Sequence, residues 1–137
     1  MTTSSIRRQH EATSIPELVG SVCGAFVAVM NTRAGFVGPM YIQLSGVWHR
    51  FYIDAGCLFW AEGHAPEPED DLLDGDIYVD LGESLHVIDT TVSSIRMADC
   101  ELLVEFGNGG RLELREAVQD EGTRILEATP APDVGSR

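Results

Sequence analysis

Short runs in which apolar and polar residues alternate are the feature that most constrains the fold of this chain. In residues 47–54, His49 and Phe51 share one face of an extended strand, because successive side chains of a strand point to opposite sides. Turn-forming residues separate such runs, for example Ser-Gly at 45–46 and Gly-Asn-Gly-Gly at 107–110. No helical period of useful length accompanies them, so the pattern predicts an all-β fold.

The expected strands are short and number about eight, which favours a single-domain antiparallel sandwich or a partly open barrel. The runs that carry the pattern are 21–31, 41–45, 47–54, 57–62, 77–81, 92–98, 101–106, 111–115 and 123–128, with 85–88 as a further short candidate. Gly-Pro at 38–39 predicts a turn. A capping-box pattern at 14–17, with proline in its first turn, predicts at most one short N-terminal helical turn.

This pattern predicts one β-rich domain over residues 14–128, with an acidic loop at 62–83. Residues 1–13 are polar and lack periodicity, so we expect a flexible N-terminal arm. Residues 129–137 contain two prolines and no apolar run, so we expect a flexible C-terminal tail.

The acidic stretch 62–83 has the most unusual chemistry of the chain. It contains nine carboxylates and no base: Glu62, Glu67, Glu69, Asp70, Asp71, Asp74, Asp76, Asp80 and Glu83. The whole chain has 22 acidic and 9 basic residues. Subtracting the nine acids of this stretch leaves 22 − 9 = 13 acids, together with all 9 bases, in the rest of the chain. The net charge of −13 therefore divides into −9 on this stretch and −4 on the rest. Such a negative patch repels nucleic acid and anionic membranes and speeds encounter with basic partners.

Composition excludes several functions. All nine bases are arginines, scattered singly apart from one pair at 7–8, whereas direct nucleic-acid binding needs a basic face. The absence of lysine excludes Schiff-base and P-loop chemistry. The apolar run 18–30 is too short to span a bilayer. Three widely spaced cysteines without a CxxC motif are typical of buried thiols in a reducing compartment, so we expect a cytoplasmic protein.

The acidic stretch also raises the question of a divalent metal. If Asp70 opens an EF-hand loop, Leu72 and Leu81 occupy the third and twelfth positions, where oxygen ligands are required. An irregular site is chemically better supplied with ligands, from Asp70, Asp71, Asp74 and Asp76. The competing interpretation is a solvated turn whose charge protects a sheet edge, and we assign neither a metal nor a cofactor.

Two faces of residues 47–54 carry candidate functional side chains. His49 shares its face with apolar residues, which predicts a hydrogen-bonded histidine in the core or in a pocket. Trp48, Arg50 and Tyr52 lie on the other face and would either fill the core or form a partner-binding surface. Alternation does not distinguish a core position from a surface position for these three side chains, because it does not say on which side the second sheet lies. Core packing is the favoured interpretation.

We therefore expect a non-enzymatic binding protein, a bacterial inhibitor of the immunity or antitoxin type that masks a basic partner protein. Toxins that act on nucleic acid carry cationic clefts, and an acidic surface would occupy such a cleft with fast, salt-sensitive association. The expected contact residues are Glu67, Glu69, Asp70, Asp71, Asp74, Asp76 and Asp80 with Trp48, Arg50 and Tyr52.

The alternative is a β domain that binds a small ligand or a divalent metal, with the ligand in the mouth of a barrel. We expect a monomer or a homodimer. In a dimer, an edge strand such as 41–45 would pair across a two-fold axis.

Overall fold

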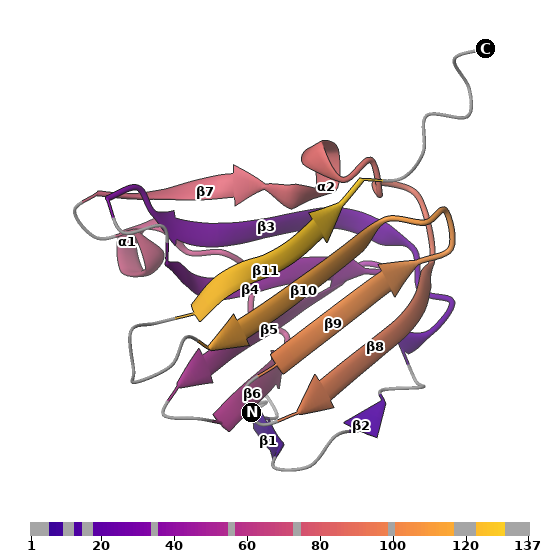
Figure 1. The fold of residues 1–137 in the computed structure, drawn as a ribbon, viewed down its shortest axis with the longest axis horizontal. Coiled ribbons are helices and arrows are strands. Elements are labelled where there is room, and N and C mark those ends of the chain that lie inside the picture. Colours follow the sequence, from indigo (N-terminus) through magenta and orange to yellow (C-terminus); the bar gives the residue numbers. More distant parts are fainter. Residues whose placement is uncertain are drawn as a thin grey trace.

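The chain folds into two antiparallel sheets that pack face to face, as the computed structural model shows (Figure 1). It describes residues 6–9, 13–14, 18–33, 36–54, 57–72, 75–98, 101–116 and 123–130. Within these ranges lie eleven strands and two single-turn helices, and no closed barrel forms. The predicted all-β fold is therefore confirmed, and of the two predicted architectures it is the sandwich.

The first sheet has the strand order β1–β6–β5–β4–β3–β7. Its strands are β1 (Ile6–Gln9), β3 (Cys23–Asn31), β4 (Val37–Leu44), β5 (Val47–Asp54), β6 (Cys57–Glu62) and β7 (Asp76–Asp80). The tight turn between β4 and β5 is the predicted one: Ser45 and Gly46 both have positive φ, at 50° and 84°. This is the combination that matches the twist of two antiparallel strands.

The second sheet has the order β11–β10–β9–β8–β2. Its strands are β2 (Thr13–Ser14), β8 (Val92–Ala98), β9 (Glu101–Phe106), β10 (Arg111–Glu116) and β11 (Thr123–Thr129). One residue pair, Thr123 of β11 with Val37 at the start of β4, joins the second sheet to the first. The predicted Gly-rich turn at 107–110 connects β9 and β10.

The core lies between the sheets and takes one face of each strand. Phe26, Met40 and Phe51 from the first sheet and Ile95 and Leu112 from the second are fully buried. The ring of Phe26 contacts that of Phe106 on β9, with 5.9 Å between centroids, which ties the two layers together. Cys23 is a free thiol buried in the same core, as expected of a small hydrophobic residue.

His49 is the one buried polar side chain among the residues whose burial is described. The indole Nε1 of Trp60 donates a hydrogen bond to His49 Nδ1 at 3.0 Å. The predicted hydrogen-bonded core histidine is therefore confirmed, and Trp60, which lies on the neighbouring strand, belongs to the core with it.

Gly38 and Pro39 lie inside strand β4, where the sequence predicts a turn. Met40 pairs with Ala28, but Val37 pairs with Met30, so β4 has one extra residue and forms a bulge. The turn prediction is wrong because β3 and β5 pair with β4 on its two sides and keep the chain extended. Proline, which has no N–H to donate, is tolerated at a bulge.

The acidic stretch is not a single loop. It contains α1 (Pro68–Asp71), β7 and α2 (Leu81–Ser84), so two helical turns lie in this stretch, where the sequence predicts none. Pro68 occupies the first turn of α1, and the Asp80 side chain caps α2 by accepting a hydrogen bond from the Glu83 backbone N–H at 3.0 Å.

The N-terminal region differs from the expected flexible arm. Residues 6–9 form β1, which pairs with β6, and residues 13–14 form β2, which pairs with β8. Edge pairing needs only backbone groups, so polar residues can join a sheet without an apolar pattern. The rest of 1–13, most of the 14–17 helical turn, and 131–137 lie outside the described residues.

Two further strand predictions need correction. Residues 85–88 form turns that connect α2 to the second sheet, and His86 has a positive φ of 58°. Residues 41–45 do not lie at an edge, since β4 is paired on both sides. One edge of the first sheet is β7, which matches the predicted edge strand at 77–81. No helix in the described ranges is long and apolar enough to cross a membrane.

We predict that Gly110→Ala lowers the free energy of unfolding by about 1–3 kcal/mol, because added core volume forces neighbouring atoms to shift. A Cβ at Gly110 would overlap Cγ1 of the fully buried Val87. The control is Gly38→Ala, whose Cβ would lie 3.6 Å from Val29 Cβ in ordinary contact. Urea unfolding measures both variants, and equal losses would contradict the packing around Val87.

Candidate functional site

Helix α1 lies against the outer face of the first sheet and is held there by the carboxylate of Asp71. Tyr41 of β4 donates its hydroxyl to Asp71 Oδ1 at 2.7 Å, and Tyr78 of β7 donates to Asp71 Oδ2 at 2.7 Å. The backbone N–H of Glu67 donates to Oδ2 at 2.9 Å. The two tyrosine donors therefore hold the acidic helix against the sheet, and the bond to Glu67, the residue that caps α1, closes the helix's own turn.

The same contacts perturb the two tyrosines. Burial, and then the hydrogen bond to the Asp71 carboxylate, raises the pKa of Tyr41 and of Tyr78 well above the ordinary value. The Arg50 guanidinium acts in the opposite direction on the pKa of Tyr41, without cancelling the rise. Both hydroxyls therefore stay protonated and act as donors.

The outer face of β5 carries Trp48, Arg50 and Tyr52, all partly exposed. They alternate with His49 and Phe51, which point into the core, so core packing was the wrong interpretation for these three side chains. Their outward orientation follows from the packing of the second sheet on the opposite face.

Arg50 lies between two aromatic rings. Its Cζ atom is 4.9 Å from the ring centroid of Tyr52 and 6.0 Å from that of Tyr41. The ring of Tyr52 in turn stacks on Phe59, with centroids 4.9 Å apart. A guanidinium is attracted to the faces of aromatic rings, so these contacts position the charge at the surface.

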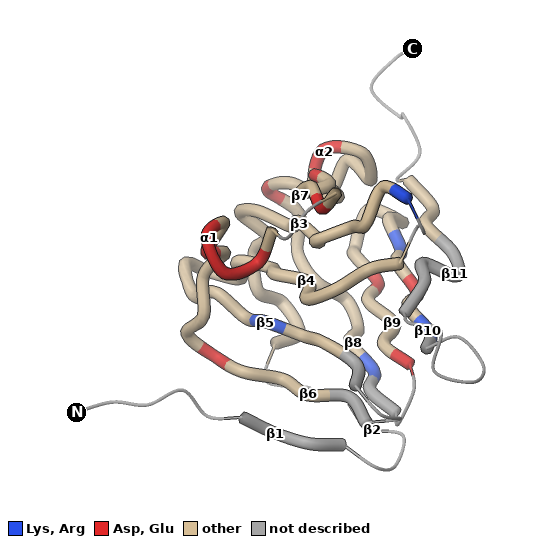
Figure 2. Tube along the Cα trace, turned by 90° about the vertical axis from the view of Figure 1, so that its left-hand side faces the viewer, with Lys and Arg blue, Asp and Glu red and all other residues tan. Residues whose placement is uncertain are grey.

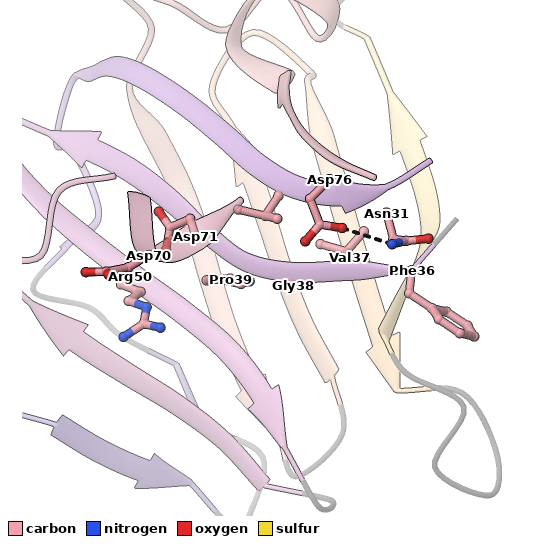
Figure 3. Close-up of a pocket in the computed structure, with 10 residues that line it drawn as sticks. Asn31, Phe36, Val37, Gly38, Pro39, Arg50, Asp70, Asp71 and Asp76 are labelled. Carbon is pink, nitrogen blue, oxygen red and sulfur yellow. Dashed lines mark hydrogen bonds between the residues drawn. The ribbon is translucent and has the colours of Figure 1, made fainter. Parts of the chain in front are cut away.

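A pocket of about 380 Å³ opens beside α1, over the bulge in β4 (Figure 3). Its lining combines carboxylates, one guanidinium, one amide and apolar groups: Val29, Asn31, Phe36, Val37, Gly38, Pro39, Arg50, Asp70, Asp71 and Asp76. Asn31 Nδ2 donates to Asp76 Oδ1 at 3.0 Å, which fixes the carboxylate at one end (Figure 3). Residues far apart in the sequence thus meet in one small cavity.

The structure places the predicted contact residues in different parts of the molecule. Asp70, Asp71, Asp76 and Arg50 line the pocket, and Glu67 and Glu69 are exposed on α1 beside it. Asp80 lies at the far end of β7 from Asp76 and caps α2. Trp48 is on the same sheet face but does not line the pocket, and Asp74 lies outside the described residues.

The charges of the two sheets are organised differently (Figure 2). On the second sheet, Arg111 pairs with Glu105 at 3.1 Å and Arg115 pairs with Glu101. In contrast, the exposed side chains of Glu67, Glu69 and Asp70 form no ion pair with any described residue. The uncompensated negative charge therefore gathers at α1 on the first sheet.

No three His, Cys, Asp or Glu side chains within the described ranges are arranged so that they could hold a metal ion. Asp70, Asp71 and Asp76 share the pocket but do not form such a group. Comparison with protein-family models, curated proteins and solved structures finds no match to this chain.

Sequence reasoning missed the residues that organise this site. Tyr41 and Tyr78 lie on predicted strands, but no local signal connects them to Asp71, which is 30 positions from Tyr41. Asn31 and the Gly38-Pro39 bulge were missed for the same reason. A local signal did exist for α2, since Asp80 and Glu83 have the spacing of a capping box.

We predict that Asp71→Asn lowers the pKa of Tyr41 and Tyr78 and destabilises the protein by about 2 kcal/mol, because charge-assisted hydrogen bonds to a carboxylate are lost. Absorbance titration of tyrosinate and urea unfolding measure the two effects. The matched control is Asp70→Asn, since the exposed Asp70 side chain makes no hydrogen bond to a described residue. If both variants behave alike, Asp71 does not hold the helix.

We also predict that stability falls at alkaline pH. Burial, and then the charges of Asp89 and Asp80, raises the pKa of Cys23 from 9.0 to about 11. The unfolded chain thus loses this proton first as the pH rises, so the stabilisation is complete below pH 9 and disappears towards pH 11. The tyrosines act in the same direction above their ordinary pKa. Urea midpoints across this range should decrease, and Cys23→Ala should make the first part of the decrease shallower.

Proposed function

We propose that this chain is a non-enzymatic acidic binding protein that masks a basic partner protein, in the manner of a bacterial immunity protein or antitoxin. The observation that carries the proposal is the acidic helix α1, which Asp71 fixes against the sheet while Glu67, Glu69 and Asp70 stay exposed without an ion pair to any described residue. A charge surface that is already ordered pays little conformational entropy on binding.

The neighbouring side chains support a protein partner. Arg50, Tyr52 and Trp48 lie on the same outer face as α1, and arginine and aromatic residues are enriched at the energetic centres of protein interfaces. Acidic residues around them would steer a basic partner and give fast association. We place this interaction in the cytoplasm, with the chain acting as a monomer or homodimer.

The proposal predicts that Glu67→Gln with Glu69→Gln weakens partner binding roughly 2–30-fold, since each exposed charge pair contributes about 0.2–1 kcal/mol. The native chain serves as bait in lysate of the source organism at low and high salt, followed by titration with the captured protein. We expect a basic protein whose affinity falls as the salt concentration rises.

The matched control is Glu101→Gln with Glu105→Gln, which removes two charges from the second sheet. Both double variants have a net charge of −13 + 2 = −11, so a difference in net charge cannot explain a difference between their affinities for the partner. The control should retain the partner. Equal affinity of both variants and the native chain would overturn the proposal.

A second candidate function, small-ligand binding, is favoured by one observation. The pocket of about 380 Å³ falls within the size range of small-molecule sites, roughly 300–1,000 Å³. Native mass spectrometry of the protein purified from its source tests this function, and a stoichiometric bound compound that Gly38→Val removes would support it.

A further inference from the structure

The pocket beside α1 contains charges of both signs that are not paired with each other. No hydrogen bond or ion pair joins the Arg50 guanidinium or the Asp70 carboxylate to a described residue, although both line the pocket. Arg50 Nε is moreover buried without a hydrogen-bond partner in the described part of the chain. Because Nε is closed to an incoming group, the donors available to a ligand are the terminal nitrogens of the guanidinium, which are not among the buried unpaired atoms of the described residues.

The net negative charge of the side chains that line the pocket favours a cationic ligand. Asp70, Asp71 and Asp76 contribute three negative charges and Arg50 one positive charge, which leaves −3 + 1 = −2. Asp71 is already positioned by its tyrosine donors, and Asp76 by Asn31. A phosphate or a nucleic-acid backbone would meet three carboxylates here and is disfavoured.

The shape of the pocket favours a long side chain with an apolar stem. Its lining includes Val29, Val37 and Pro39, and Gly38 has no side chain to fill the space over the bulge (Figure 3). A methylene chain would pack on this apolar surface while its charged end reaches the carboxylates. Guanidinium has five donors in a planar fork and can bond to more than one carboxylate, whereas ammonium is a compact point charge.

We propose that this pocket binds an arginine side chain of the basic partner, and that the Arg50 guanidinium donates to a backbone carbonyl oxygen of the same partner segment. This inference rests on the proposed function and names its central contact. An extended peptide arginine supplies both the cation and the acceptor that the unpaired groups of the pocket require.

The test is an NMR titration of the full chain with the capped peptide acetyl-Gly-Arg-Gly-amide. The matched peptide contains citrulline, which keeps the shape of arginine and removes the charge. We expect millimolar binding of the arginine peptide, with shifts at Asn31, Tyr41 and Asp76, and citrulline binding at least about 10-fold weaker. Equal affinity for the two peptides would overturn the inference.

Two variants locate the binding. Gly38→Val fills the pocket, and its Cβ would make only ordinary contact with Val29, so the fold should survive, which thermal unfolding verifies. Asp70→Asn removes one carboxylate, and Glu83→Gln on α2 is the charge-matched control outside the pocket. Gly38→Val and Asp70→Asn should each weaken peptide binding, at least about 10-fold and 3-fold respectively, and Glu83→Gln should not. Unchanged binding to Gly38→Val would place the peptide elsewhere.

The outcomes separate this inference from the proposed function. If the arginine peptide does not bind but the Glu67 and Glu69 double variant loses the captured partner, only the pocket inference fails. If the peptide binds but the double variant keeps the partner at native affinity, the proposed function and the inference resting on it both fail. Free arginine binding at least about 10-fold more tightly than the capped peptide would overturn the inference in favour of a small-ligand site.

Discussion

The hydrogen bonds of the Asp71 carboxylate are the interactions on which the position of helix α1 on the first sheet depends. The carboxylate accepts hydrogen bonds from Tyr41, from Tyr78 and from the Glu67 backbone, and so joins β4, β7 and α1. Without these bonds, a segment with two prolines and clustered like charges would repel itself and leave the sheet. One partly buried acid therefore determines where its exposed acidic neighbours are presented.

The negative charge of the described residues is distributed unevenly between the two sheets. Ion pairs across β9 and β10 compensate Arg111 and Arg115 of the second sheet, whereas the exposed acids at α1 form no ion pair with a described residue. Long-range attraction of a basic partner would act through this side, and the bulge in β4 provides a cavity at the same place. Long-range attraction of a basic partner would thus come from the exposed acids at α1, and the partner's anchoring contact from the neighbouring pocket.

Much of the fold follows from local patterns. Alternation predicted the core position of His49, and turn chemistry predicted the connections at 45–46 and 107–110. These features depend on strand geometry and positive φ, which neighbouring residues decide. The bulge at Gly38-Pro39 was mistaken for a turn because the strands that keep it extended lie elsewhere in the sequence.

The sequence by itself determined that this chain is all-β, as a sandwich or a partly open barrel, with one concentrated acidic stretch, because alternation and charge are properties of short segments. Only the tertiary structure decided which face of β5 is outward, and that Asp71 is bound by two tyrosines while Glu67 and Glu69 remain exposed. The pocket arises from the same long-range pairing, which brings Asn31, Arg50 and Asp76 together. Contacts between distant segments depend on sheet order, and sheet order is not encoded in any single stretch.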